Sequence, residues 1–266
     1  MARLHRVIPA LVHTYIKSKT EYPGAMVLGW LSQFAAYGSM YTAISLILAR
    51  FGSLGGWLWP EMALLLAFHL LAYSLGASLS FVQFREMEDK VRMGTVDAIL
   101  VKPVSPWVFI VFSGLNIGYA GHILLAVGLM AWSLTQVDVA WTPQLALFFL
   151  GCLVSASMIV AATMTMIGAT ALVWVKSNHL YQIFFGFWEL ARYPLNIFPL
   201  PLQVLMLTFA PLAFLAFAPV AATLCKPVPL IGDFAPVAAL VAGPFCALLA
   251  IAHWRYCLRN YQGAGG

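Results

Sequence analysis

The sequence predicts an all-α integral membrane protein with six transmembrane helices, an N-terminal amphipathic helix and a helical cytoplasmic loop between the second and third spans. The first observation is composition: 62% of the 266 residues are apolar and only 9% are charged, whereas a soluble domain carries about 25% charged residues. The second is a series of apolar stretches long enough to cross a bilayer, which takes about 20 residues of helix. Long continuous runs favour helices over the short alternating strands of a β-barrel.

Residues 1–23 are predicted to form an amphipathic helix on the membrane surface. Apolar residues from Leu4 to Ile16 recur at helical spacing, and basic residues lie outside that stripe. This pattern is typical of helices on an anionic membrane face. No cleavable signal peptide is expected, because the first long apolar run begins only near Gly24. The remaining residues, 24–266, are predicted to form one transmembrane domain.

Six stretches are predicted to span the membrane: 24–49, 60–82, 106–134, 143–175, 199–224 and 236–253. Pro60, Pro106 and Pro143 mark helix starts, because proline is tolerated in the first helical turn. Residues 176–198 are a poor span because they contain Trp188, Glu189, Arg192 and Tyr193, and they are predicted to form an interfacial helix instead. Small residues in spans two to four predict close packing between helices of this chain, in preference to a dedicated dimer seam; they are Gly76, Ser80, Gly114, Gly118, Gly121, Gly151 and Ser155.

The basic residues predict the orientation of these spans. With the N-terminus in the cytoplasm, all Lys and Arg fall in inside segments except Arg50 and Lys226. Cytoplasmic loops of membrane proteins carry such an excess of positive charge. Both termini are therefore predicted to be cytoplasmic, and the net charge of +5 reflects topology and gives no reason to expect a nucleic-acid partner.

The loop between spans two and three is the most informative segment. The chain has 14 Lys and Arg residues and 9 Asp and Glu residues, and eight of these charged residues lie in the segment from Arg85 to Lys102. Charges of this kind cost about 2.5–3.5 kcal/mol each at the centre of a membrane helix. Pairs four residues apart, Glu86 with Lys90 and Glu88 with Arg92, predict a helix, which Gly94 would end. Thr95 is a possible cap of a second short helix. The apolar residues Val91, Met93, Val96, Ile99 and Leu100 are expected to need a partner, so the loop is predicted to be a docking surface.

The predicted spans contain few ionisable groups. Only His69 and His122 lie at depth, and both are expected to be packed, hydrogen-bonded interior residues. Ion-coupled carriers usually place carboxylates or histidines at depth, so a proton- or sodium-driven carrier is disfavoured. The chain has no phosphate-binding Gly-rich motif, and its four scattered Cys residues give no metal-site or disulfide pattern. If the protein does driven work, the energy must come from another chain.

Three stretches resemble one family of bacterial proteins. Residues Gly94–Pro106 (G-T-V-D-A-I-L-V-K-P-V-S-P), preceded by Glu88, are similar to a signature of ABC-2-type ABC transporter permeases. Residues Ala191–Pro199 (A-R-Y-P-L-N-I-F-P) resemble the stretch before the fifth span of that family, and Trp254–Gly265 resembles its basic C-terminal ending. The sequence departs from the commoner residues at two of these positions, Ala98 and Cys257.

The resemblance implies a transmembrane subunit of an ABC exporter in the bacterial cytoplasmic membrane. Such subunits form homodimers or heterodimers, and each binds a separate ABC ATPase subunit that holds ATP and Mg²⁺, so this chain would carry no cofactor or metal and would not be an enzyme. The loop over 84–106 would contain the coupling helix that rests on the ATPase. The residues expected to couple the two subunits are Glu86, Glu88, Asp89, Lys90, Val91, Arg92, Met93, Gly94, Thr95 and Asp97.

The expected substrate is amphipathic or hydrophobic, such as a natural product, an antibiotic or a lipid, because the spans offer apolar and aromatic side chains. Membrane lipid is the other expected partner. The residues predicted to contact the substrate are His69, Tyr73, Asn116, Phe209, Phe214 and Phe217.

Two other functions stay open from the sequence. An ATP-independent secondary carrier or channel would transport its substrate without any ATPase. An integral-membrane enzyme or assembly factor would need polar catalytic groups at the interface, where only His179, Glu189 and Arg192 lie near enough together to suggest one.

Overall fold

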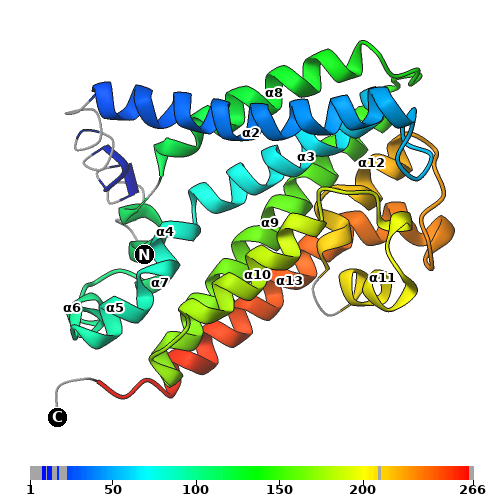
Figure 1. Ribbon diagram of the computed structural model, residues 1–266. Coiled ribbons are helices and arrows are strands. Elements are labelled where there is room, and N and C mark those ends of the chain that lie inside the picture. The colour runs from blue at the N-terminus through cyan, green and yellow to red at the C-terminus, as the bar shows by residue number, and fades with distance from the viewer. Residues whose placement is uncertain are drawn as a thin grey trace.

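The computed structural model describes residues 8, 9, 11–13, 17, 23–114, 116–208 and 211–263, and these are helical apart from loops and one isolated bridge between Leu54 and Trp57. The predicted helix over 1–23 lies almost entirely outside the described residues, and the division of the chain at residue 24 stays a prediction. Figure 1 shows α2 (Pro23–Phe51) crossing α8 (Ala120–Leu134) on one side of the molecule, whereas α9 (Pro143–Trp174) and α13 (Ala235–Arg259) run side by side on the other, and α10 (Asn178–Leu190) packs on α9. Between them α3 (Trp59–Ser78) packs on both α8 and α9.

In the described part of the chain, four helices are long and apolar enough to cross a membrane: Trp59–Ser78, Ile117–Leu134, Pro143–Trp174 and Gly232–Arg259. They correspond to the predicted spans two, three, four and six. The first predicted span is also helical, as α2, and the hydroxyl groups of Ser32 and Thr42 donate hydrogen bonds to carbonyls of their own helix. Hydroxyls satisfied in this way tolerate an apolar surrounding. That α2 crosses the membrane, and that the spans number six, stay predictions.

The third and fifth predicted spans are not continuous helices. Span three is divided into α7 (Pro106–Ser113) and a second part that begins with η1 (Ile117–Tyr119) and continues as α8. Gln83 Nε2 donates to the carbonyls of Val111 and Ser78, and Asn116 Oδ1 accepts from the Gly118 N–H, so backbone groups freed near the break find partners. The fifth is divided into α11 (Leu200–Leu207), η3 (Leu212–Leu215) and α12 (Phe217–Thr223), with Pro211 and Pro219 in this stretch.

The stretch predicted as an interfacial helix is helical and is not among the candidate membrane-spanning helices of the described chain, and its position relative to the membrane stays a prediction. It forms α10, which packs on α9 and is followed by η2 (Leu195–Ile197). Glu189 and Arg192, two of the residues on which that prediction rested, form an ion pair; Arg192 is only 5% exposed, whereas the Glu189 side chain is 56% exposed. The pair therefore joins a buried guanidinium group to a carboxylate at the surface, and pairing lowers the cost of burying Arg192.

Close contact between α9 and α13 organises the bundle. Gly243 of α13 touches the backbone of Ser155 of α9, where an added Cβ would overlap the Ser155 carbonyl oxygen. Ser155 Oγ donates to the Ala239 carbonyl (2.6 Å) and accepts from the Gly243 N–H (2.9 Å), so it is inserted between two groups that would otherwise bond within α13. Gly76 of α3 makes a similarly close approach to Ser157 of α9. Gly76, Ser155 and Gly243 therefore serve packing within the chain, as predicted for the first two.

A Gly243→Ala change should lower stability by about 1–3 kcal/mol, the usual cost of overpacking, because neither backbone can move without separating α9 from α13. The measurement is the apparent melting temperature of the detergent-solubilised protein. Gly128→Ala in α8 is the matched control, since no atom lies within 4 Å of the added Cβ there. Equal melting temperatures for the two variants would contradict the close α9–α13 contact.

Candidate functional site

The charged loop folds into three short helices, α4 (Phe81–Arg85), α5 (Met87–Arg92) and α6 (Thr95–Leu100). Gly94 separates α5 from α6 with φ +68°, a left-handed conformation that glycine adopts without strain. The predicted stop at Gly94 is therefore confirmed. Thr95 does not cap α6 as proposed: its Oγ1 donates back to the Lys90 carbonyl (3.0 Å), and Gly94 occupies the capping position.

Three of the five apolar residues that were expected to need a partner find it within the chain. Val91, Val96 and Ile99 are buried in a second apolar cluster with residues of α4, α7, α9 and α13. Met93, by contrast, is 68% exposed, Leu100 37% and the neighbouring Val101 85%. The apolar part of the loop that remains uncovered is thus smaller than predicted, and it is concentrated at the tip. We call Arg92, Met93, Thr95, Leu100 and Val101, all exposed, the α5–α6 surface.

The loop's charged side chains have two kinds of partner. Lys90 Nζ pairs with Glu86 Oε2 at 2.8 Å, which confirms the predicted pair, and Arg92 pairs with Asp89 at 2.7 Å. The predicted pair between Glu88 and Arg92 is wrong, because Glu88 turns toward another helix. Asp97 is half-buried and lies near Gly263 of the C-terminal tail.

Glu88 closes the start of α10. Its Oε2 atom accepts hydrogen bonds from the backbone N–H groups of Ser177 and Asn178, both at 2.9 Å. The first N–H groups of a helix have no partner within it, and the N-cap residue, Ser177, makes no side-chain cap here. A carboxylate from α5 therefore does what a cap from the helix's own sequence usually does.

The two backbone N–H groups lower the pKa of the Glu88 carboxyl below its ordinary value of 4.5, with smaller contributions of the same sign from His179 and Arg92. Partial burial of the side chain acts in the opposite direction. The carboxylate form is thus the one that fits this position, and a negative charge is favourable at a helix N-terminus.

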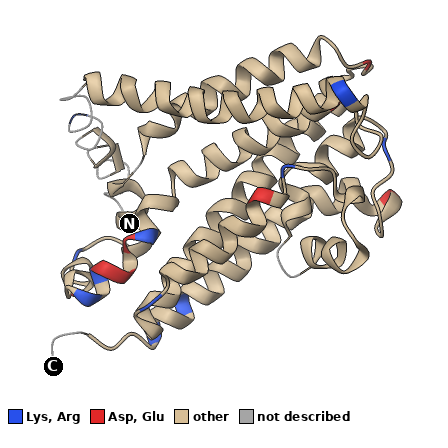
Figure 2. Ribbon diagram, in the orientation of Figure 1, with Lys and Arg blue, Asp and Glu red and all other residues tan. Residues whose placement is uncertain are grey.

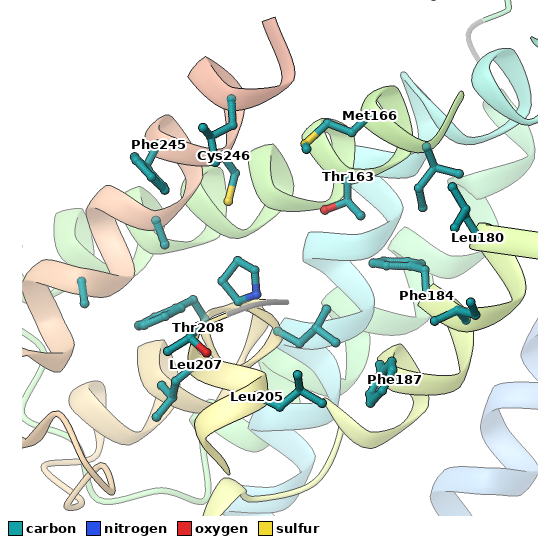
Figure 3. A pocket seen from close by; sticks show the side chains of 18 of the residues that line it. Thr163, Met166, Leu180, Phe184, Phe187, Leu205, Leu207, Thr208, Phe245 and Cys246 are labelled. Carbon is teal, nitrogen blue, oxygen red and sulfur yellow. The ribbon is translucent and has the colours of Figure 1, made fainter. Parts of the chain in front are cut away.

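Beyond its start, α10 forms one wall of an apolar pocket of about 610 Å³, shown in Figure 3. Leu180, Phe184 and Phe187 of α10 face Thr163 and Met166 of α9 and Phe245 and Cys246 of α13, and residues of α11 and η3 close another side (Figure 3). None of the described lining residues is charged. Thr163 and Thr208 donate their hydroxyl hydrogens to their own helices, so the described lining offers a guest chiefly apolar and aromatic contacts.

A second group of side chains lies between α2, α3, α8 and α10. The His69 ring lies 4.5 Å from that of Trp188, and Tyr73 stacks near Trp188 at 4.8 Å while its hydroxyl lies 3.2 Å from that of Tyr119. Arg192 lies over Trp188 as well, at 5.3 Å. Within the described residues, His69 Nε2, Trp188 Nε1 and Arg192 Nε have no hydrogen-bond partner.

The predicted substrate contacts are thus distributed over several places. His69 and Tyr73 lie in this aromatic group. Phe214 lines the pocket. Phe217 packs on Trp57 at 5.6 Å, Asn116 caps η1, and Phe209 lies outside the described residues. His122 is packed against Tyr37 at 4.8 Å as expected, but its Nδ1 has no hydrogen-bond partner in the described chain.

The residues that sequence reasoning missed are on α10. Ser177 and Asn178 are residue types that favour helix starts, and this signal could have placed a helix beginning at 178. Nothing in the spacing of the sequence could have paired that start with Glu88, which lies 89 residues away from Ser177. The apolar wall at Leu180, Phe184 and Phe187 has helical spacing and was visible in principle.

A Glu88→Gln change should destabilise the protein at neutral pH by about 0.3–1 kcal/mol, because it removes the negative charge from the α10 start. A lowered pKa in the folded state means that this stability is present above pH 4.5 and is lost as pH falls through the lowered pKa. The melting-temperature difference between wild type and variant should therefore stay constant from pH 7 to about 5 and shrink in more acidic buffer. Glu86→Gln, which removes only an exposed ion pair, is the control. If the difference in melting temperature between wild type and Glu88→Gln did not change with pH, the proposed charge effect would be contradicted.

The comparison with protein families agrees with the fold and with the loop. The model of a family described as ABC-2 family transporter protein matches residues 34–265, which include α3 to α13 and the loop helices. Comparison with curated proteins and with solved structures yields no match. An all-helical fold with four candidate membrane-spanning helices suits a membrane permease. The chain therefore belongs to the ABC-2 family of transporter proteins, multi-pass membrane permeases of ABC transporters.

Proposed function

We propose that this chain is the transmembrane subunit of an ATP-driven exporter that moves an amphipathic or hydrophobic substrate out of a bacterial cell. One observation carries the proposal: Glu88 joins the loop to the start of α10, and α10 forms a wall of the apolar pocket. A force applied to the loop would therefore reach the pocket through two hydrogen bonds and one helix.

Energy would enter at the α5–α6 surface. Figure 2 shows charged residues gathered at the end of the molecule that carries α5 and α6, and the C-terminal ends of α9 and α13 lie there too. Basic residues at this end, Lys102, Lys176, Arg255 and Arg259 among them, favour a cytoplasmic location. Exposed Met93, Leu100 and Val101 give an ATPase subunit apolar contacts, and Arg92 beside them gives a charged rim.

The loop is built to move as a unit. Its apolar side, with Phe84, Met87 and Val91, is packed on α9 and α13, and Gly168 of α9 approaches the Phe84 backbone so closely that an added Cβ would lie 2.6 Å from it. Packed interiors transmit displacement because they have few voids. ATP-driven closure of the ATPases would press on α5 and α6, and α10 would follow because its start is tied to Glu88.

The pocket favours the class of substrate. Its described walls offer aromatic and aliphatic contacts without a charged residue, and its volume lies within the range of about 300–1,000 Å³ typical of small-molecule sites. A second permease, either a copy or a paralogue, would complete the transporter. The exposed apolar residues of α2, among them Leu28, Leu31 and Leu46, offer either lipid or that second subunit a surface.

An ATP-independent carrier is the second candidate, and one observation favours it. Arg192 is buried close to His69 and pairs with the more exposed Glu189, so Arg192 joins His69 and His122 among the ionisable groups inside the molecule. A carrier would use them to bind its driving ion. Such a protein would transport its substrate in vesicles without an ATPase or ATP.

Glu88→Lys and Gly94→Pro should uncouple the transporter. The first change would present a positive charge to the positive end of the α10 dipole, and in the second, proline fixes φ near −65° where Gly94 has +68°. The protein, purified from its native membranes, should carry a co-purifying chain that is labelled by azido-ATP and hydrolyses ATP. Both variants should reach the membrane at wild-type levels but lose that activity or its stimulation.

Gly52→Pro is the matched control, because Gly52 also has a positive φ (+81°) but lies between α2 and α3, away from the loop. Full ATPase stimulation in the Glu88 and Gly94 variants would refute the coupling role. Vesicle transport that persists without any ATP-labelled chain would favour the carrier.

A further inference from the structure

A second pocket, of about 600 Å³, lies between the start of α7 and the helices α9 and α13, away from the one described above. Four alanines make room for it: Ala161 and Ala162 on α9, and Ala247 and Ala250 on α13. Their short side chains leave a groove where larger residues would fill the space between the two helices. Met158 and Ile251 complete its apolar walls.

One end of the groove is polar. Ser105, Trp107, Trp254 and Arg255 lie there, at the end of the molecule that we propose to be cytoplasmic. Arg255 is exposed, and it has no ion pair or hydrogen bond to any residue that the structure describes. Tryptophan side chains prefer the membrane–water boundary, so the exposed Trp107 indicates where the lipid head groups would begin.

We propose that this groove binds a phospholipid with a net negative head group, one acyl chain lying between α9 and α13 and the phosphate on Arg255. The acyl chain would fill the apolar groove, because side chains that line an empty groove lose van der Waals contacts. The guanidinium group matches phosphate oxygens, often with two hydrogen bonds. A zwitterionic head group has the same phosphate but adds a positive charge, which Arg255 would repel. The site should therefore prefer anionic phospholipids.

The site would connect lipid composition with the loop. Trp254, in the groove wall, packs edge-on against Phe84 at 5.9 Å, and Leu258 packs on the same apolar cluster as Val91 and Ile99. A bound acyl chain would therefore pack on the same α13 residues that contact α4 to α6. The binding itself is independent of the proposed transport function; only its assignment to the inner leaflet uses the proposed orientation.

Native mass spectrometry of the full-length protein, titrated in detergent with phosphatidylglycerol or phosphatidylcholine, tests the proposal. The wild type should retain phosphatidylglycerol more strongly. Arg255→Gln should weaken phosphatidylglycerol binding about five-fold, as expected from about 1 kcal/mol for one basic residue near anionic lipid, and leave phosphatidylcholine binding nearly unchanged. Arg259→Gln is the matched control, one turn further along α13, exposed and outside the groove.

A second pair of variants tests the chain-binding part. Ala247→Phe should fill the groove and reduce retention of both lipids, whereas Leu248→Phe, on an exposed position of the same helix outside the groove, should reduce neither. Equal losses of phosphatidylglycerol in the two arginine variants would overturn the proposal, since they would show only a general charge effect. It would also be overturned if Ala247→Phe left lipid binding intact and changed the ratio of monomer to dimer, because the groove would then be an interface between copies.

Discussion

The account depends on one carboxylate that completes a helix from another part of the chain. Glu88 accepts hydrogen bonds from the first two N–H groups at the start of α10, where the side chain of Ser177 makes no cap. Free N–H groups at a helix start need partners, and here the partner stands on the loop between two spans. The loop helix α5 thus supplies a side-chain partner for the α10 start that Ser177 does not supply. The Glu88 contact acts together with a ring contact, because Phe81 of α4 packs on Tyr181 and Phe185 of α10.

The helices α3, α9 and α13 form a closely packed frame around this contact. Ser155 bonds both Ala239 and Gly243 of α13, and Gly76 brings α3 against α9, so these three helices approach closely. Helices within a lipid bilayer associate through close packing of small residues and through hydrogen bonds, because the hydrophobic effect does not drive association there. By contrast, the stretch from α10 to α12 is divided into α10, η2, α11, η3 and α12, and much of it borders the pocket. A frame with one broken, tethered segment is suited to transmitting motion.

Hydropathy alone predicted the helices that pack through continuous apolar surfaces, namely α3, α9 and α13, because length and composition decide whether such a segment can cross a membrane. It failed where tertiary partners decide. Hydropathy did not show that Arg192 would be buried and paired with the more exposed Glu189. Local spacing paired Glu88 with Arg92, but two backbone N–H groups from the α10 start bind it instead. Val91, Val96 and Ile99 were correctly predicted to need cover, yet the sequence could not show that α7, α9 and α13 provide it.

The central claim is that α5 and the start of α10 move together, and pulsed electron–electron double resonance tests it directly. Spin labels at Asp89 and His179, both exposed, report the distance across the Glu88 contact; a second pair at His179 and Gly128 reports α10 against α8. When the ATPase partner and ATP are added to the reconstituted protein, the distance between 89 and 179 should stay constant while that between 179 and 128 changes. A changed distance between 89 and 179 with α10 stationary relative to α8 would contradict the account.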